Sequence, residues 1–564
     1  MLVPVVLVVA MAWDRRWMAD DGFLHLRVVD QVVEGNGPVF NAGERVETST
    51  SPLWVWLLTL LSFVTGLALP WKAVVAGLVL TAIGMVAAAR AAVILGRAHG
   101  GAGVVWPVGL AAVAALPPIW DYATSGLETG LAFAWIGGSC WWVAVRATRP
   151  APPSRRAELA GAVLVSVGYT IRPDLALFTI AFGAVLVAAC RPSGWRRAAG
   201  VAAALAAVPL LNQVFRMGYY ALLVPNTALA KEASVAQWGS GLRYLADLVR
   251  PYALWVPAAA VAVVLWAEVA ADRERRAHLV TAARLAPVAA SLAHALYITR
   301  VGGDFMHARL LLPAVFGLLA PVGIAPRRCR PGRRSRGLAA AVAVWVVLAT
   351  VLLRPTYSGE TAVFTTGNTI EDERRTWQLL TGMEHPVRHD VRTRRVAAAA
   401  GTAPQNGRVV GIAPDDDYEP VEVPMRPDAP ATAAGVFLQP AYAWNSGVYM
   451  IDTGGLAHPV GGHLDQLSGD RMGHQKFLGL DWQLAEWTAA RTVTSDDGRL
   501  LVSGESLAAA REAVTCGQLG AYIEGIRSPL TPGRFARNVL ESFANTTLRV
   551  PADPRDARAE LCGG

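Results

Sequence analysis

Apolar residues dominate the first two thirds of the chain in long runs, and short polar stretches separate these runs. A helix needs about 20 apolar residues to cross the hydrocarbon core of a bilayer. The pattern predicts about eleven crossings, at residues 1–17, 71–97, 103–118, 126–146, 157–171, 174–190, 197–213, 252–271, 283–299, 307–325 and 337–353. Residues 354–564 mix polar and apolar positions like a water-soluble domain of about 210 residues. We therefore predict a polytopic α-helical membrane part, 1–353, and a soluble C-terminal α/β domain, 354–564.

Two apolar segments depart from this pattern. The first, 1–17, is short for a membrane span, so either Trp13 and Trp17 anchor it at the membrane interface or the true start lies upstream. The second, 51–66, is apolar enough to cross, but a crossing there would change the side of the loops that follow. We predict an interfacial or re-entrant helix instead, which is tolerated where it packs against protein.

Basic residues are concentrated in loops between the apolar runs, with clusters at 146–156, 191–197, 273–276 and 327–336. Because Lys and Arg mark cytoplasmic loops, this arrangement predicts a cytoplasmic N-terminus and an extracytoplasmic C-terminal domain. The same placement accounts for the net charge of +8, so we expect no nucleic-acid partner. The inward loops offer mostly arginine and small residues, and the chemistry is therefore expected on the outer face.

Asp20 and Asp21 follow the first apolar run in WMADDGFLHLR, where adjacent carboxylates repel each other and are costly at a membrane boundary. Apolar residues between positions 23 and 33 predict a helix lying along the membrane surface. The two acids would then cap its N-terminus. A cap needs only one acid, and the second indicates a base, a nucleophile or a metal ligand. We predict that Asp20 and Asp21 are catalytic, and a divalent cation beside them is an open alternative.

Four more acids lie in predicted outer loops. Glu44 and Glu47 belong to GNGPVFNAGERVETSTSPLW and either bind a polar ligand or are solvated. Asp121 and Glu128 belong to DYATSGLET, and Glu128 begins an apolar helix, where a carboxylate is costly without a partner. Stabilisation by the helix dipole is the alternative to ligand contact for Glu128.

Cations are predicted on the same outer face. Arg172 lies beside Asp174 at the tip of a predicted helical hairpin, where it either forms an ion pair or clamps a phosphate. The other polar residues of this face are Lys231, Arg300, Asp304, His307 and Arg309. Cations at helix ends often only orient the chain, but the outer side opposes the positive-inside preference. An anionic ligand therefore explains at least two of them better.

Local motifs narrow the chemistry further. The sequence contains no Walker loop and no HExxH, CxxC or GxSxG motif, so nucleotide hydrolysis, zinc peptidase and serine hydrolase activities have no local support. Cys516 and Cys562 both lie in the C-terminal part, and we predict that they form a disulfide if this part faces an oxidising compartment.

Nine segments, in this order, resemble the AftB family of actinobacterial terminal arabinofuranosyltransferases: ADDGFLHLR, GNGPVFNAGERVETSTSPLW, DYATSGLET, RPD, FRMGYYALLVPNTALAK, RPYALWVP, GGDFMHARLLLPA, DERR and RSPLTPGRFARNVLESF. They extend from about residue 12 to residue 550. The early segments also resemble the wider class of GT-C membrane glycosyltransferases, which use lipid-phosphate sugars. The resemblance implies a GT-C-like fold for the membrane part.

The resemblance also implies an activity: transfer of β-D-arabinofuranose from decaprenyl phosphate to the non-reducing ends of cell-wall arabinan, in terminal β(1→2) linkage. The acceptors would be arabinogalactan and lipoarabinomannan, gripped by the outer domain of a multi-pass plasma-membrane protein. Residues expected to hold the donor phosphate are Arg172, Lys231, Arg300, His307 and Arg309. Residues expected to contact the sugar or the acceptor are Glu44, Glu47, Asp121, Glu128, Tyr219, Asn226 and Asp304.

Stereochemistry limits the mechanism that the resemblance implies. Donor and product are both β, so the net configuration is retained. Retention requires either double displacement on an aspartate nucleophile or a front-face path with an ion-pair intermediate. Both paths stay open from the sequence, and so does the choice of Asp20 or Asp21 as the residue that contacts the reacting carbon.

Three other functions compete with this one. A transferase that uses polyprenyl-linked mannose or glucose would share the acid pair and the cations. A transporter of a lipid-linked sugar predicts polar residues at the bilayer midplane, whereas the candidates here lie outside. A structural cell-wall assembly protein would leave Asp20, Asp21, Arg172 and Lys231 without a task.

Overall fold

The first part of the computed structural model is helical. Its elements are α1 (Leu2–Asp14), α2 (Asp20–Val33), α3 (Pro52–Val64), α4 (Leu69–Gly96), α5 (Val108–Ala114), α6 (Pro117–Tyr122), α7 (Thr129–Thr148), α8 (Arg155–Ser166), α9 (Gly168–Ile171), η1 (Pro173–Leu175), α10 (Ala176–Cys190), η2 (Arg191–Ser193), α11 (Trp195–Tyr220), α12 (Asn226–Ala230), α13 (Trp238–Val249), α14 (Trp255–Glu274), α15 (His278–Arg300), η3 (Arg309–Leu311), α16 (Leu312–Leu319) and α17 (Arg333–Val351). The structure describes residues 2–98, 104–149, 153–324, 333–351, 370–388, 408–413, 419–430, 432–435, 447–465, 473, 475–495 and 497–563.

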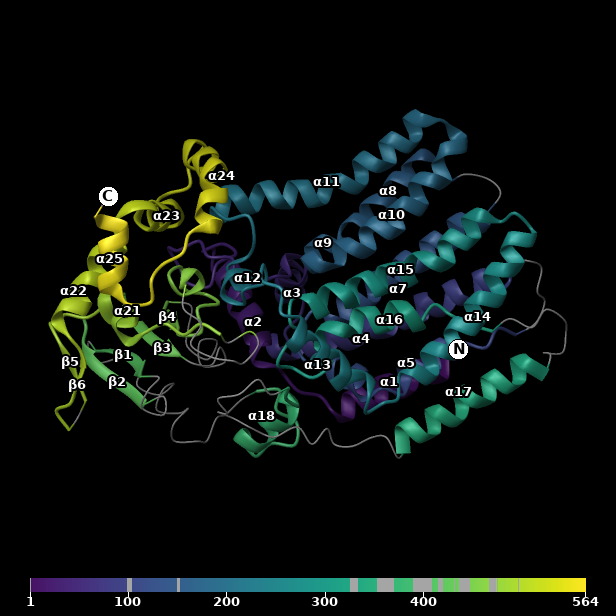
Figure 1. Cartoon of the computed structure of the whole chain (residues 1–564), viewed down its shortest axis with the longest axis horizontal. Coiled ribbons are helices and arrows are strands. Elements are labelled where there is room, and N and C mark those ends of the chain that lie inside the picture. The colour runs from purple at the N-terminus through teal and green to yellow at the C-terminus, as the bar shows by residue number, and fades with distance from the viewer. Residues whose placement is uncertain are drawn as a thin grey trace.

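Long apolar helices make this part a membrane-embedded bundle. Within the described ranges, five stretches are long and apolar enough to cross a bilayer: Leu69–Gly96, Pro173–Ser193, Trp195–Tyr220, Trp255–Glu274 and His278–Arg300. These helices lie together at one end of the molecule in Figure 1. The protein is therefore mostly helical and membrane-embedded, and the count of eleven crossings stays a prediction.

Two predicted segments test the helix boundaries. The run 103–118 does not form one helix, because α5 ends at Ala114 and α6 begins at Pro117. Pro117 and Pro118 explain the break, since a residue before proline is pushed out of the helical conformation and proline fits a new first turn. The segment 51–66 forms α3, whose 13 residues fall short of the length of a span and pack against α2 and α4. This favours the predicted non-crossing helix.

Helix α2 forms where predicted, but protein encloses it. Phe23 and Leu26 pack in a core with α3 and α4. On its polar side Arg27 is 2% exposed and donates hydrogen bonds to the carbonyls of Phe40 (2.8 Å) and Val448 (2.6 Å). Helix α2 is thus enclosed by other parts of the chain, and its position along the membrane surface stays a prediction. Its amphipathic pattern is real, but one partner of the polar face comes from 421 residues further along the chain.

The C-terminal region contains sheets and helices. Its elements are α18 (Glu373–Thr381), β1 (Arg408–Ala413), β2 (Glu419–Pro424), β3 (Thr432–Gly435), β4 (Tyr449–Asp452), η4 (Gly461–His463), α21 (Leu480–Ala485), β5 (Val493–Thr494), β6 (Leu500–Val502), α22 (Gly504–Ala513), α23 (Gly517–Arg527), α24 (Pro532–Thr547) and α25 (Pro554–Cys562). One sheet has the order β2-β1-β3-β4, antiparallel between β1 and β2 and parallel elsewhere. Strands β5 and β6 form a separate antiparallel pair.

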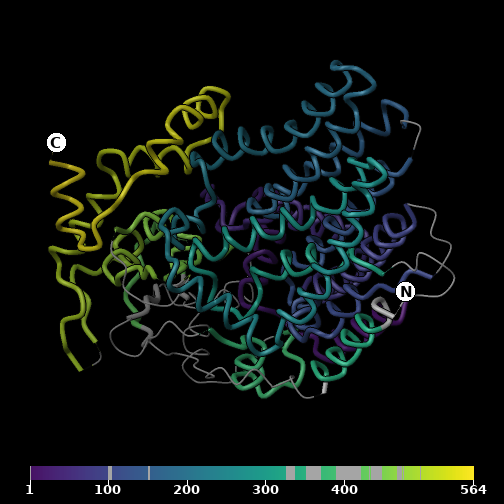
Figure 2. Tube along the Cα trace, turned by 45° about the vertical axis from the view of Figure 1, so that its right-hand side comes forward, coloured from purple at the N-terminus to yellow at the C-terminus, as the bar shows by residue number. Residues whose placement is uncertain are grey.

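This region is built against loops that leave the membrane helices. Its core contains Ile451 and Leu484 together with Val46, Leu222 and Leu229 from the first part of the chain. Figure 2 shows the region beside the ends of the helices, with the two chain termini at opposite ends of the molecule. The predicted domain boundary between residues 353 and 354 stays a prediction.

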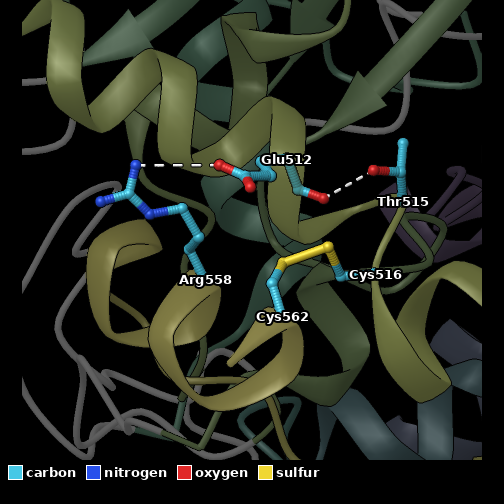
Figure 3. The surroundings of a disulfide bond; sticks show 5 residues. All are labelled: Glu512, Thr515, Cys516, Arg558 and Cys562. Atoms are coloured by element: carbon cyan, nitrogen blue, oxygen red, sulfur yellow. Dashed lines mark hydrogen bonds and ion pairs between the residues drawn. A yellow bond between two sulfur atoms is a disulfide. The ribbon is translucent and has the colours of Figure 1, made fainter. Parts of the chain in front are cut away.

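Cys516 and Cys562 form a disulfide, with their Cα atoms 5.2 Å apart. It joins the start of α23 to the end of α25, beside an ion pair between Arg558 and Glu512 (Figure 3). The cross-link closes a loop with a sequence separation of 46. A loop of this size restricts the unfolded chain strongly.

We therefore expect the double substitution Cys516→Ser and Cys562→Ser to lower the free energy of unfolding of this region by roughly 2–4 kcal/mol. Limited proteolysis across a denaturant series, read in peptides of α22–α25, measures the change. Reductant should weaken the wild type to the same level and leave the double variant unaffected. Free thiols at both positions, found by mass spectrometry without reductant, would contradict the pairing.

Candidate active site

The first turn of α2 holds Asp20 and Asp21. Ala19 occupies the N-cap position in an extended conformation and offers no side-chain cap. Instead the backbone N–H of Asp20 donates a hydrogen bond of 2.9 Å to Oε1 of Glu373, from α18. The helix dipole also favours acids in a first turn. The cap and the dipole together fix where the helix begins and how both aspartates are presented.

The carboxylate of Asp21 contacts two cations from distant parts of the chain. Nη1 of Arg309 donates to Oδ2 of Asp21 at 2.7 Å and lies 3.5 Å from Oδ2 of Asp304. Nζ of Lys231 lies 3.7 Å from the same oxygen of Asp21. We call Asp21, Lys231, Asp304 and Arg309 the acid–cation cluster. Its contacts hold the Asp21 carboxylate in one orientation, between two positive charges.

A second group of charges adjoins this cluster. Arg172 donates to both oxygens of Asp174, at 3.0 and 2.7 Å, and lies 3.7 Å from Glu128. Glu128 in turn lies 3.5 Å from His25 of α2. Arg309 is within electrostatic range of both Arg172 and Glu128. Buried charges of this kind are costly unless they are paired, so the pairs are part of what keeps the site folded.

The three cations differ in exposure, which decides which of them an anion can reach. The side chain of Lys231 is 29% exposed, against 10% for Arg172 and 9% for Arg309. Lys231 is therefore the most accessible of the three, while neighbouring acids hold both arginines. Cations fixed in advance by such contacts suit an anion that develops charge during a reaction, such as a departing phosphate.

A small polar cavity lies beside the N-terminus of α2. It is lined by Arg15, Trp17, Pro117, Asp121, Tyr122, Tyr252, His307, Glu371, Asp372, Glu373 and Arg374. Asp121 accepts two hydrogen bonds from Arg15, at 2.6 and 2.9 Å. His307 lies between Asp247 (2.6 Å) and Tyr252 (3.0 Å). Asp121 and His307 are thus held at the edge of the cluster rather than within it.

Glu373 lies between this cavity and the two aspartates. Its Oε1 accepts hydrogen bonds from the Asp20 N–H and from Nε1 of Trp377 (3.1 Å). Its Oε2 is buried and has no hydrogen-bond partner in the part of the chain that the structure describes. Burial, reinforced by the negative charges of Asp21 and Asp20, raises the pKa of Glu373 to about 8. Glu373 is therefore mostly protonated at neutral pH.

The raised pKa of Glu373 predicts that stability falls as the pH rises. A carboxyl whose pKa increases from 4.5 to about 8 on folding contributes stability that is complete below pH 4.5 and is lost as the pH rises through 8. Glu373→Gln keeps an acceptor for the Asp20 N–H but does not titrate. We expect it to flatten the dependence of melting temperature on pH over this window. Glu384→Gln, an exposed carboxyl beyond the same helix, is the control and should keep the wild-type slope.

Two predicted contact residues form ion pairs between the first part of the chain and later segments. Glu47 accepts hydrogen bonds from Arg216, one of them 3.0 Å long. Glu44 accepts from Arg527 at 2.8 Å and from the hydroxyl of Tyr449 at 3.1 Å. These pairs fasten the loop after α2 to α11 and to the C-terminal region. A role of Glu44 or Glu47 in sugar contact stays a prediction.

Tyr219 and Asn226 also contact protein groups. The ring of Tyr219 stacks on Phe215, with centroids 5.0 Å apart. Nδ2 of Asn226 donates to the carbonyls of Gly455 and Leu456, both at 3.0 Å. Asn226 thereby holds the loop after β4. Sugar contacts by these two residues likewise stay predictions.

Of the five predicted phosphate-binding residues, the structure places three at or next to the acid–cation cluster and two elsewhere. Lys231 and Arg309 meet at Asp21, and Arg172 joins them through its neighbour Glu128. His307 belongs to the cavity described above. Arg300 hydrogen-bonds the carbonyl of Ser234 at 3.4 Å, at the end of α15.

The residues around Asp21 suit an anion better than a divalent cation. Within the described ranges, no group of three or more His, Cys, Asp or Glu side chains is arranged to hold a metal ion. A metal ion at the Asp21 carboxylate would also meet the positive charges of Arg309 and Lys231 at short range.

Sequence reasoning missed Glu373, Asp247 and Tyr252. Glu373 belongs to the DERR segment, which carried the family resemblance but received no role. Its contact with Asp20 joins positions 353 residues apart, and no local pattern encodes such a pairing. The sequence feature that could have indicated Glu373 is its position as an acid within a segment that resembles the family.

Comparison with known proteins identifies relatives along nearly the whole chain. Residues 445–560 match the AftB family C-terminal domain. The chain is 34% identical to the terminal beta-(1->2)-arabinofuranosyltransferase of Mycobacterium tuberculosis, over 96% of this chain and 94% of the relative. It is 31% identical to the protein of the same name from Corynebacterium glutamicum, over 97% of this chain and 85% of the relative. No solved structure matches the chain.

The membrane-embedded helices and these relatives define the class of protein: a membrane glycosyltransferase. Such an enzyme requires a sugar donor and a glycan acceptor. Within this class, the chain belongs to the family of terminal β-(1→2)-arabinofuranosyltransferases, and its residues 445–560 match the AftB family C-terminal domain.

Proposed function

We propose that this enzyme transfers arabinofuranose from decaprenyl-phosphoryl-β-D-arabinofuranose to the non-reducing ends of cell-wall arabinan, in arabinogalactan and lipoarabinomannan. The product is a terminal β(1→2) linkage. The observation that carries the proposal is the similarity, over 96% of the chain, to a relative named for forming this linkage. The acid–cation cluster supports it, because the cluster combines a carboxylate with cations suited to a phosphate leaving group.

The proposed architecture is a GT-C-like fold of the plasma membrane, with about eleven crossings and a soluble extracytoplasmic α/β domain. The active site opens to the extracytoplasmic side. Arginine clusters between the apolar runs support this orientation. The Cys516–Cys562 disulfide supports it independently, because disulfides persist in oxidising compartments.

The donor is proposed to keep its polyprenyl tail in the lipid. Its phosphate is proposed to contact Lys231, with the more buried Arg309 and Arg172 further inside the protein. The acceptor is proposed to approach from the side of the C-terminal region. Asp452, at the end of β4, supports this approach: burial raises its pKa to about 6, and the charge of Asp21 contributes. The charge of Asp21 is therefore felt at the end of β4, on the side from which the acceptor is proposed to approach.

During transfer the bond between the anomeric carbon and the phosphate oxygen breaks, and a bond to the acceptor 2-hydroxyl oxygen forms. The proton of that hydroxyl passes to the released phosphate or to an aspartate carboxylate of the site. The phosphate leaves with the electron pair, which the cations stabilise. Retention of the β configuration leaves two paths. In one, Asp21 or Asp20 forms a glycosyl ester that the acceptor then displaces; in the other, the acceptor attacks an ion pair on the same face. A 2-fluoro donor that slows the second step separates them, because only the first path adds the sugar mass to an α2 peptide.

A donor screen tests the proposed function. The purified full chain in nanodiscs is given polyprenyl-phosphoryl arabinofuranose, mannose or glucose, together with a defined arabinan oligosaccharide. We expect product only from arabinofuranose, with a β(1→2) linkage by NMR. Product from mannose or glucose would favour the rival transferase. Movement of the lipid-linked sugar across the membrane without any new glycosidic bond would favour a transporter.

Lys231→Ala should raise the KM for the donor by roughly 10- to 100-fold, the loss expected for one hydrogen bond to a charged group. The kcat at saturating donor should change less, because Arg309 still faces the site. Arg243→Ala, an exposed cation of nearby α13, is the control. An unchanged KM in Lys231→Ala would refute the phosphate contact.

The alternative of a divalent cation beside Asp20 and Asp21 has its own test. The proposal predicts unchanged turnover after treatment with EDTA and gel filtration. Loss of turnover that Mg²⁺ or Mn²⁺ restores would support the metal instead.

A further inference from the structure

Helix α24, in the family's C-terminal domain, has its polar and apolar faces reversed. The side chains that it buries against the protein are polar: Asn538, Ser542 and Asn545. Its large apolar side chains point outward, with Leu540 83% exposed and Phe543 68% exposed. A helix on the water-exposed surface of a protein normally shows the opposite arrangement.

The outward side chains form a continuous stripe. After the first turn, the exposed residues of α24 are Ala536, Arg537, Leu540, Phe543, Ala544 and Thr547, and all of them except Arg537 are apolar or small and recur at helical spacing. Positions four, seven, eight and eleven residues apart share one face of a helix. Isolated exposed apolar residues are common on proteins, but an aligned stripe opposite a polar buried face requires a partner.

Hydrogen bonds fix α24 to the end of α11. Nδ2 of Asn538 donates to the carbonyl of Gly218 at 2.9 Å, and Nδ2 of Asn545 donates to the carbonyl of Ala221 at 3.1 Å. The hydroxyl of Thr546 accepts from the N–H of Leu223 at 2.8 Å. Figures 1 and 2 both show α24 lying across this end of α11. The polar face of α24 thus caps the backbone where α11 ends.

Of the five candidate membrane spans in the described ranges, α11 has the least protein around it. Only 6% of its most apolar window is buried inside the protein. Leu211, Val214 and Phe215 are 70%, 49% and 42% exposed on its last turns, next to the contact with α24. The lipid-facing surface of α11 therefore leads directly to α24.

From this continuity we infer that α24 is an interfacial helix, with its outward stripe immersed in the lipid leaflet at the Tyr220 end of α11. An amphipathic helix lies in the membrane interface with its apolar face buried at the headgroup boundary. Lipid covers the apolar stripe, and the polar face donates hydrogen bonds to backbone carbonyls at the end of α11. The C-terminal domain thereby contacts the bilayer through its own residues.

Nitroxide labelling of the full chain in nanodiscs tests this position. Single cysteines replace Leu540 or Phe543 in a Cys329→Ser background. Cys140 and Cys190 are buried, and Cys516 and Cys562 are paired. Accelerated relaxation by oxygen reports lipid, and relaxation by a water-soluble nickel complex reports water. The control is Leu500→Cys, a leucine 58% exposed in the β5–β6 hairpin of the same domain.

We expect labels at 540 and 543 to respond at least about 5-fold more to oxygen than to nickel, and the label at 500 to show the reverse preference. Equal nickel access at all three positions would overturn the inference. Dipolar coupling between labels of two copies of the chain would overturn it as well, because a second copy would then cover the stripe.

Discussion

Replacing Asp21 with asparagine should lower the turnover of glycosyl transfer by at least about 100-fold, the lower end of what one acid–base group contributes. Asparagine keeps the shape of the side chain and can still accept a hydrogen bond from Arg309. It lacks the negative charge that either attacks the anomeric carbon or stabilises an oxocarbenium-like transition state. Turnover of an arabinofuranosyl donor in nanodiscs, with product measured by mass spectrometry, gives the change directly.

Asp30→Asn is the matched control for this prediction, because Asp30 lies on the same helix but away from the acid–cation cluster. It should leave turnover within about 3-fold of the wild type, because the half-buried carboxyl of Asp30 is not part of the cluster. Asp20→Asn completes the set and tells the two neighbours apart. Normal turnover in Asp21→Asn would remove Asp21 from the mechanism, whatever Asp20→Asn does.

Replacing Arg309 with glutamine should damage both stability and activity. Its guanidinium is buried and faces the carboxylates of Asp21 and Asp304, so its loss leaves negative charges together without a counterion. Breaking a buried pair from one side costs roughly 3–5 kcal/mol. We expect a lower melting temperature and turnover near background, measured on the same nanodisc preparation.

A double-mutant cycle separates these two effects. Asp21→Asn combined with Arg309→Gln removes both partners, so it should recover part of the stability lost in Arg309→Gln alone. Turnover should not recover, because the carboxylate is still missing. Equal stability of Arg309→Gln and the wild type would mean that the ion pair is not formed in the folded enzyme.

Much of the helical framework could be predicted, because a bilayer imposes a local rule on composition. The apolar run at 71–97 lies within α4 and the residue after it, and the run at 197–213 lies within α11. The prediction ended α11 too early, since RMGYY is polar enough to resemble a loop. In the structure the last turn continues to Tyr220, where α24 supplies polar partners.

The site was predicted in part for a similar reason. The membrane topology inferred from the arginine clusters predicted that Asp21, Lys231 and Arg309 lie on the same outer face. The structure brings these three residues together. Which acid pairs with which arginine was not predictable. Glu44 pairs with Arg527 through a contact 483 residues apart in sequence, and nothing near Glu44 encodes it.

The hydrogen bond between the Asp20 N–H and Glu373 also has a consequence for biosynthesis. Its two ends are 353 positions apart, so a ribosome working at about 5–20 residues per second makes the donor group roughly 20–70 s before the acceptor. The reactive helix therefore waits, uncapped, while the rest of the membrane bundle is inserted. A nascent or truncated chain that stops before α18 lacks this cap, so the first turn of α2 is completed only after α18 has been made.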